Sequence, residues 1–112
     1  MAATRHSFGI LVLTHLPDRD AALELARTLV TGRLAACVNV GAPVESMYHW
    51  RGQIETAQEV PVTIKTRAAL YPRVEAAIRA RHPYELPEIV AVPFSHGLRS
   101  YLDWLAAETV AP

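Results

Sequence analysis

The segment from Leu34 to Lys65 constrains the fold most strongly, because it predicts a β-hairpin with two unusually long arms. The first arm, Leu34 to Trp50, is interrupted at Gly41-Ala42-Pro43, and the turn falls at Arg51-Gly52. The second arm runs from Gln53 to Lys65. Strands in globular domains average about 5 to 6 residues, whereas each arm here has roughly fifteen. A hairpin of this length should overhang the core of a small domain.

Strands and helices alternate on either side of this hairpin. The apolar run Phe8–Leu13 predicts a first strand, and Asp18 and Gly32 are typical of the start and end of a helix that follows it. A second helix is predicted from about Arg67 to Arg81, where His82-Pro83 ends it, and a last strand over Glu88–Phe94. The order βαββαβ predicts an α+β, ferredoxin-like sandwich with an antiparallel four-stranded sheet and both helices on one face.

Several local expectations accompany these elements. The apolar positions expected to face the sheet are Leu23, Ala26, Leu29 and Val30 in the first helix and Leu70, Val74, Ala77 and Ile78 in the second. Ser100 followed by Asp103 is typical of a capping box, which predicts an extra C-terminal helix. Pro61 should lie at a sheet edge or a bulge, because proline has no backbone N–H for the ladder.

Length and charge limit the classes of function. The 112 residues fit one globular domain, 1–112, and leave no room for a second. Eleven basic and eleven acidic residues cancel, so a nucleic-acid partner is not expected. No apolar run approaches the ~20 residues that cross a bilayer, and Met1–His6 lacks a signal-peptide core. We therefore expect a cytoplasmic protein without a membrane partner, and the single cysteine, Cys37, agrees with a reducing compartment.

The overhanging hairpin also indicates an oligomer. It carries Met47, Tyr48, Trp50 and Ile54, and it leaves backbone groups without a partner strand. Apolar surface and unpaired backbone groups both cost free energy unless something covers them. Pairing with another copy of the chain would cover them, and the alternative is a hairpin that curls back over its own sheet.

Four separated segments are similar, in order and spacing, to the signature segments of the CutA divalent-cation-tolerance family. They are Arg33-Leu34-Ala35-Ala36-Cys37-Val38-Asn39, Tyr48-His49-Trp50-Arg51-Gly52, Glu59 with Ile64-Lys65-Thr66, and His82-Pro83-Tyr84-Glu85-Leu86-Pro87-Glu88-Ile89. The ending Tyr101-Leu102-Asp103-Trp104-Leu105 matches as well. The resemblance covers nearly the whole chain, from about Gly9 to Ala107.

This resemblance implies a ferredoxin-like subunit in a homotrimer, similar in shape to the PII signalling proteins, with the long hairpin pairing across subunits. It also implies a role in divalent-cation tolerance and copper binding, and it implies no agreed catalytic reaction. Some family members carry a cysteine at the end of the first strand and two adjacent histidines before the Pro-Tyr. This chain has Thr14 and Arg81-His82 at those positions, so only His82 carries over.

His82 and His15 are the candidate metal ligands, for copper or another divalent cation. Imidazole binds copper and zinc well, but two to four donors must converge on the metal. His15 could supply a second donor if the end of the first strand meets the end of the second helix. The alternative role for His82 is to hydrogen-bond the last carbonyls of that helix. His6, His49 and His96 have no partners at ligand spacing and are interpreted as surface residues.

A cleft between subunits is the second candidate site. Glu59 and Lys65 are six residues apart in one predicted strand and so share a face. The candidate cleft residues are Cys37, Tyr48, Trp50, Glu59, Lys65, Tyr84 and Glu88. Such a mixture suits a small-ligand pocket, although an interfacial ion pair with aromatic packing would use the same residues. Cys37 in its apolar run, and Trp104, also suit simple packing.

The sequence contains no nucleophile elbow, phosphate loop or zinc-protease motif, so we do not predict an enzyme. The predicted function is a trimeric protein that binds copper or another divalent metal ion in response to metals. The alternative is a PII-like regulatory or scaffold trimer whose clefts hold a small ligand or a protein partner.

Overall fold

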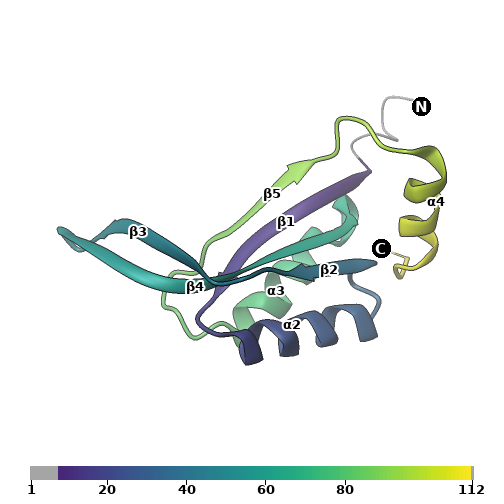
Figure 1. Cartoon of the computed structure of the whole chain (residues 1–112). Coiled ribbons are helices and arrows are strands. Elements are labelled where there is room, and N and C mark those ends of the chain that lie inside the picture. The colour runs from purple at the N-terminus through teal and green to yellow at the C-terminus, as the bar shows by residue number, and fades with distance from the viewer. Residues whose placement is uncertain (1–7, 112) are drawn as a thin grey trace.

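The chain folds as an antiparallel sheet with two helices on one face (Figure 1). A computed structural model describes residues 8–111, so the expectations for Met1–His6 and His6 lie outside the described residues. The elements are β1 (Gly9–Leu16), α2 (Arg19–Thr31), β2 (Cys37–Val40), β3 (Val44–Trp50), β4 (Gln53–Arg67), the 3₁₀ helix η1 (Ala68–Leu70), α3 (Tyr71–Arg81), β5 (Ile89–Pro93) and α4 (Arg99–Ala107). None of the helices in this range has the length and apolar character needed to cross a bilayer.

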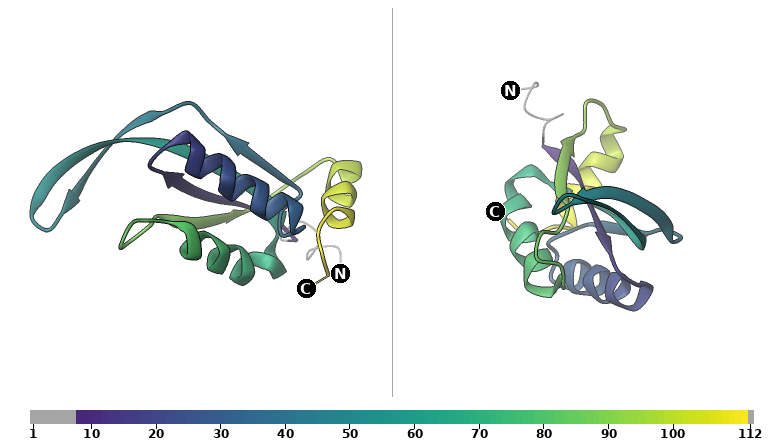
Figure 2. Two further views of the ribbon diagram at one scale, coloured as in Figure 1. Left: turned by 90° about the horizontal axis from the view of Figure 1, so that it is seen from below. Right: turned by 90° about the vertical axis from the view of Figure 1, so that its left-hand side faces the viewer.

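The sheet has the order β2-β4-β1-β5, and β3 pairs with the outer half of β4. Every pairing is antiparallel, and both helices lie against the same side of the sheet (Figure 2). The predicted α+β, ferredoxin-like sandwich with an extra C-terminal helix is therefore confirmed. The first predicted arm of the hairpin forms two strands, β2 and β3, because Gly41–Pro43 breaks it where the sequence indicated.

The core fills the space between the sheet and the helices. Alternate residues of the two central strands, such as Val12 and Ile64, face α2 and α3 and are fully buried. The other members of the core are Ile10, Leu16, Ala22, Leu25, Leu29, Ala35, Val60, Val62, Val74 and Ile78. Burying a side chain of this kind contributes about 1.5–3 kcal/mol each, and this layer holds β1 and β4 in register.

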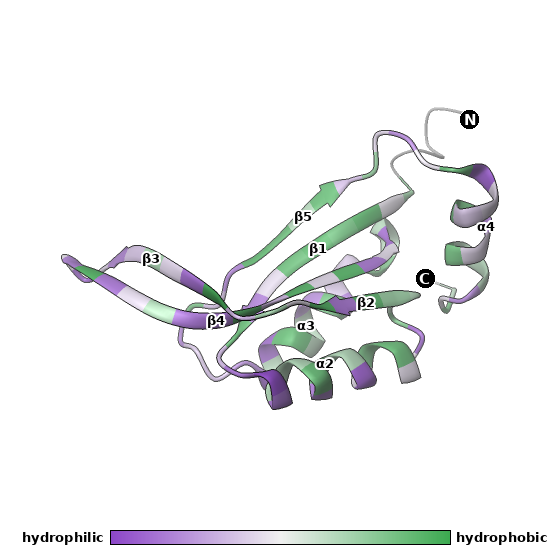
Figure 3. Cartoon of the chain, in the orientation of Figure 1, coloured by the Kyte–Doolittle hydropathy of each residue, from purple (hydrophilic) through white to green (hydrophobic). Residues whose placement is uncertain are grey.

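The opposite face of the sheet carries no helix and remains partly apolar. We call it the open face and define it by Leu11, Leu13, Val90 and Val92, which β-strand alternation and the β1–β5 register place together. Val90 is 48% exposed and Val92 is 46% exposed. Both strands are coloured mainly as hydrophobic in Figure 3. A single chain thus leaves an apolar surface on the side away from its helices.

The hairpin of β3 and the outer part of β4 projects beyond the end of the sheet (Figure 1). Arg51 and Gly52 both have positive φ angles, 50° and 79°, which is the type I′ turn that matches the twist of a two-residue hairpin. The molecule measures 47 × 26 × 23 Å, and its radius of gyration is 14.9 Å. A compact domain of this length would have a radius of gyration of about 13 Å. The predicted overhang is confirmed, rather than a hairpin that curls back over its own sheet.

Pro61 lies in the interior strand β4 at an irregular point of the ladder, where three residues, Gly41–Pro43, oppose Val60 and Pro61 and the pairing shifts by one residue between β2 and β3, as expected for a bulge. Its carbonyl accepts a hydrogen bond from Gly41 N at 2.9 Å, so this edge of Pro61 faces the segment between β2 and β3. The N–H and C=O of one strand residue point the same way in an antiparallel ladder. The N–H that Pro61 lacks would therefore point at residues 41–43, where neither β2 nor β3 continues the ladder. A Cβ on Gly41 would lie 2.9 Å from Pro61 Cγ, so the close approach requires glycine.

Two local predictions were wrong. Helix α2 begins after Asp18, whose side chain accepts the Ala21 N–H as predicted, but it buries Ala22, Leu25 and Leu29 while Val30 is 44% exposed. The apolar residues of this helix form two stripes, the predicted one and the one that contains Ala22, Leu25 and Leu29. Packing against the sheet buries the second stripe. Helix α4 has Leu98 as its N-cap, without a side-chain capping hydrogen bond, and Ser100 lies inside the helix. The predicted capping box is therefore absent at the start of α4.

Candidate functional site

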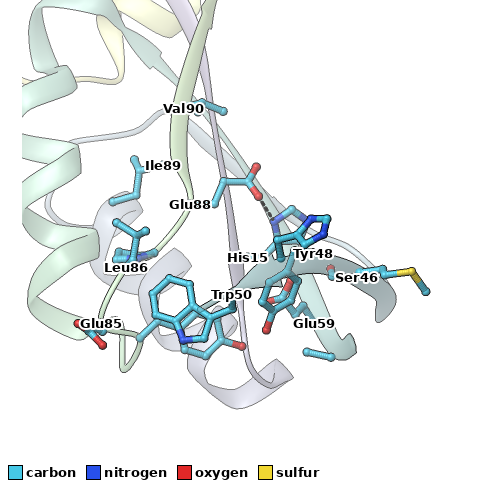
Figure 4. Close-up of a pocket in the computed structure, with 15 residues that line it drawn as sticks. His15, Ser46, Tyr48, Trp50, Glu59, Glu85, Leu86, Glu88, Ile89 and Val90 are labelled. Carbon is cyan, nitrogen blue, oxygen red and sulfur yellow. Dashed lines mark ion pairs between the residues drawn. The ribbon is translucent and has the colours of Figure 1, made fainter. Parts of the chain in front are cut away.

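A large cavity opens between the hairpin, the end of β1 and the segment that leads from α3 into β5 (Figure 4). Its volume is about 1090 Å³, near the upper end of the range for small-molecule sites. Backbone geometry explains the arrangement, because the protruding hairpin forms one wall and the 84–90 segment returns past it to reach β5. The cavity is thus built where three parts of the chain, distant in sequence, come together.

Most of the predicted cleft residues line this cavity. They are Tyr48, Trp50, Glu59, Tyr84 and Glu88, together with the candidate metal ligand His15. Cys37 and Lys65 do not, and they face each other in the β2–β4 ladder instead. Lys65 shares a face with Glu59, as predicted, but six residues of strand separate them by about 20 Å. The structure therefore splits the predicted set in two.

Glu59 is the buried polar centre of the cavity. It is only 8% exposed, and its carboxylate accepts a hydrogen bond from the Tyr84 hydroxyl. Burial and this bond to a negative group, with Tyr48 also nearby, raise the pKa of Tyr84 from 10.0 to about 12. Both causes stabilise the neutral phenol over the phenolate. Tyr84 is thus held as a hydrogen-bond donor to Glu59 throughout the physiological range.

We expect tyrosine absorbance to record this interaction in an alkaline titration. The Tyr84 pKa is higher in the folded than in the unfolded protein, so its contribution to stability is present below pH 10 and is lost as the pH rises towards about 12. The hydrogen bond to Glu75 also raises the pKa of Tyr71, so Tyr84→Phe should remove one phenol from the late titration and leave that of Tyr71, and Glu59→Gln should move the Tyr84 step towards pH 10. Tyr101→Phe, which alters α4 outside the cavity, should leave the step unchanged. A late step of unchanged amplitude in Tyr84→Phe would contradict the assignment.

His82 joins three parts of the site through its ring. Its Nε2 lies 2.5 Å from the backbone oxygen of His15, and its Nδ1 accepts the Tyr84 N–H at 3.2 Å. These partners assign the proton to Nε2, because Nδ1 must keep its lone pair to accept. The ring also packs against Tyr84, with centroids 4.7 Å apart. In this geometry neither ring nitrogen is available to a metal, and ligation by His82 would first require one of these hydrogen bonds to break.

The predicted meeting of the end of β1 with the end of α3 does occur. It brings His82 to the backbone of His15, whereas the His15 imidazole points elsewhere. His15 Nδ1 lies 3.2 Å from Glu88 Oε1, although the two groups are not aligned as a hydrogen bond. Figure 4 shows this pair at the upper side of the cavity. An imidazole nitrogen and a carboxylate oxygen therefore lie together, with His15 Nδ1 buried and otherwise unpartnered.

The cavity also uses residues that the sequence analysis did not assign to it. His49, interpreted as a surface residue, is exposed but lines the cavity, and Glu85 lines it from the opposite wall. Arg51 at the hairpin turn reaches Glu85 at 2.7 Å and lies 5.2 Å from the centroid of the Trp50 ring. Glu85 belongs to a segment that the sequence analysis singled out, but the contact with Arg51 depends on how far the hairpin bends.

Within residues 8–111, no group of three or more His, Cys, Asp or Glu side chains is placed to hold a metal ion. The nearest arrangement is the His15–Glu88 pair with Glu59 in the same cavity. Cys37 is partly buried, and its Sγ lies 4.0 Å from Asn39 Oδ1. Trp104 packs against Tyr101 at a centroid distance of 5.5 Å, which agrees with a packing role.

Fold and site together define a class: a small α+β protein with a ferredoxin-like sheet, a protruding hairpin and a ligand-sized cavity at the base of that hairpin. The CutA1 divalent ion tolerance protein family matches residues 10–108. The chain belongs to this family, as the sequence resemblance indicated.

Individual relatives agree. The divalent-cation tolerance protein CutA of Thermus thermophilus is 41% identical over 99 residues, which are 88% of this chain and 96% of that protein. The chloroplastic CutA of Arabidopsis thaliana is 38% identical over 90% of this chain, but this chain spans only 56% of its length. Crystalline CutA1 from Shewanella sp. SIB1, described as a stable protein, superposes with a TM-score of 0.89 at 40% identity and covers 92% of this chain and 96% of that one.

Proposed function

We propose that this chain acts in divalent-cation tolerance as a cytoplasmic homotrimer that binds a divalent metal ion, with copper the leading candidate. Membership of the divalent ion tolerance family supports the cation. The observation that carries the proposal is the side-by-side placement of His15 Nδ1 and Glu88 Oε1, 3.2 Å apart in the cavity. We propose a binding role and no catalytic reaction.

The proposed metal site begins with two donors of complementary kind. Imidazole nitrogen suits copper and zinc, and a carboxylate oxygen commonly completes such a set. Glu59 lies in the same cavity as a further carboxylate. Water or a side chain of a second copy would have to supply the remaining donors, because a copper or zinc ion takes about four ligands. His82 supports the site through the backbone of His15 and is not a ligand in this scheme.

The proposed trimer rests on two surfaces that a single chain leaves uncovered. The open face presents Val90 and Val92, and the hairpin exposes Met47 and Ile54 at 72% and 67%. Three copies that pair through these surfaces would bury apolar area and give the hairpin backbone partners for its unpaired groups. The same assembly would close the cavity with a neighbouring copy, as the resemblance to the trimeric family implies.

Calorimetric titration with Cu(II) tests the metal proposal. We expect His15→Ala to weaken binding at least tenfold, because it removes the imidazole donor. His96→Ala, at an exposed position in the loop before α4, serves as the matched control and should bind as the wild type does. Equal affinity of His15→Ala and the wild type, or no binding by the wild type, would remove the metal from this position.

The second candidate function is a PII-like regulatory or scaffold trimer whose cleft holds a small organic ligand or a protein partner. The volume and the aromatic walls of the cavity favour this candidate. Ligand or partner binding that persists after treatment with a chelator would distinguish it from metal binding. Release by the chelator would support the metal instead.

A further inference from the structure

The cavity has a strongly uneven charge. Three glutamates line it, Glu59, Glu85 and Glu88, whereas none of its fifteen lining residues is a lysine or an arginine. Arg51 lies just outside and pairs with Glu85, so it offsets only one of the three carboxylates. A recess of one charge sign with low-dielectric walls concentrates ligands of the opposite charge. The cavity is therefore set to attract cations although the whole chain is neutral.

The walls beside these carboxylates are aromatic. Tyr48 and Trp50 contribute rings from the hairpin (Figure 4). Tyr84 contributes a third ring from the segment between α3 and β5. The faces of aromatic rings attract ammonium and guanidinium groups within about 6 Å. The chain itself contains an example, because the Arg51 guanidinium lies 5.2 Å from the Trp50 centroid while it pairs with Glu85. At the rim of the cavity, a carboxylate and an aromatic ring thus already hold a guanidinium group together.

Glu59 forms a similar corner with no cation in it. The residue is 8% exposed and accepts the Tyr84 hydroxyl, with Tyr48 close by, but none of the cationic side chains within residues 8–111 is ion-paired with it. A carboxylate in such a recess, with no cationic side chain of its own subunit beside it, attracts cations through its uncancelled charge. An arriving cation would supply the missing charge at this point.

Apolar side chains continue from this polar centre. Leu86 and Pro87 line the cavity from the segment before β5, outside the surfaces proposed for the trimer, and Leu86 is 69% exposed, so apolar surface there is open to a bound molecule. Contact with an apolar group would remove these surfaces from water, which contributes roughly 25 cal/mol for each Å². A ligand matched to the whole cavity therefore has a charged end and an apolar end.

We propose that the cavity binds an organic cation, an ammonium or guanidinium group joined to an apolar portion, with the charge between Glu59, Tyr48 and Tyr84. This inference deepens the ligand-binding candidate above by naming the chemical class of its ligand. It does not depend on the His15–Glu88 metal site, because the cation is placed at a different carboxylate. An experiment that disproves copper binding therefore leaves the organic-cation proposal standing, and the reverse also holds.

The test compares 2-phenylethylammonium with 2-phenylethanol, a neutral molecule of nearly the same shape. Trp104→Phe leaves Trp50 as the sole tryptophan, so its fluorescence reports on the cavity. Titrations contain a chelator, which removes any metal. We expect saturable binding of the ammonium, with an affinity at least tenfold above that of the alcohol. Equal affinity for both compounds, or no saturable change with the ammonium, would overturn the proposal.

Matched variants locate the cation. Glu59→Gln keeps the shape but removes the charge, and it should weaken ammonium binding at least tenfold. Tyr48→Leu, at a 42% exposed position, should weaken it severalfold while binding of the alcohol stays the same. Glu24→Gln alters an exposed carboxylate on α2, outside the cavity, and should have no effect. Unchanged ammonium binding in both Glu59→Gln and Tyr48→Leu would overturn the placement, and His15→Ala should leave it unaltered.

Discussion

Replacing both Val90 and Val92 with glutamate should convert the proposed trimer into a folded monomer of 12.3 kDa. Both side chains are about half exposed in the single chain, so glutamate at these positions leaves the core of the subunit intact. In an assembly the same positions would place like charges from three copies close together in a desolvated interface, which costs several kcal/mol. Sedimentation measures the mass, and circular dichroism checks that the subunit remains folded.

Val30→Glu provides the control for this experiment. Val30 is 44% exposed, nearly the same as Val90 and Val92, but it lies on α2, away from the open face. It should therefore leave the mass of the particle unchanged. A wild-type protein that already sediments as a monomer, or a Val90→Glu/Val92→Glu variant that keeps the wild-type mass, would show that the open face does not carry the assembly.

His82→Ala should lower the free energy of unfolding by about 3 kcal/mol, because it removes two hydrogen bonds and leaves their backbone partners without replacements. The partners are the carbonyl of His15 and the N–H of Tyr84, and the packing of the imidazole on the Tyr84 ring is lost as well. Urea denaturation of the Val90→Glu/Val92→Glu monomer measures the change without a contribution from subunit association.

His96→Ala serves again as the comparison, and its exposed position predicts a change below about 0.5 kcal/mol. The two histidine variants also separate a positioning role from ligation. If His82 positions Tyr84, then His82→Ala should weaken ammonium binding even where copper binding by the folded protein is retained. A stable His82→Ala protein that loses only copper would instead identify His82 as a ligand.

Most of the fold could be predicted from local patterns. The Arg51-Gly52 turn and the break at Gly41–Pro43 fixed the hairpin, because turn chemistry depends on few residues. The buried side of α2 could not be predicted reliably, since its apolar residues form two overlapping stripes and only tertiary packing selects Leu25 over Val30. Pro61 was expected at an edge or a bulge, and it lies where three residues of the neighbouring strands oppose two of β4, so its lost donor falls at an irregular point of the ladder.

The site was predicted less completely. Tyr48, Trp50 and Glu59 were grouped correctly from strand alternation, which assigns residues to a face. Alternation does not limit distance along that face, and Lys65 was therefore included although it lies too far along β4. His82 was predicted to bind a metal or to hydrogen-bond the last carbonyls of its helix, and its actual partner, the carbonyl of His15, leaves no signature in side-chain patterns. The contact of Arg51 with Glu85 could not be predicted either, because it depends on the bend of the hairpin.

Pro61 lies opposite the break between β2 and β3, so the neighbour of β4 on that side changes at this point of the sheet. On one side β4 is fixed between two neighbours and a packed core, and on the other it is held by β3 alone. The last pair of β4 with β1, Leu16 with Val60, lies next to its first pair with β3, Val44 with Glu59, so β4 passes from the sheet into the arm without an unpaired stretch. Because Val60 belongs to the packed core, the base of the arm is anchored in the subunit that presents it.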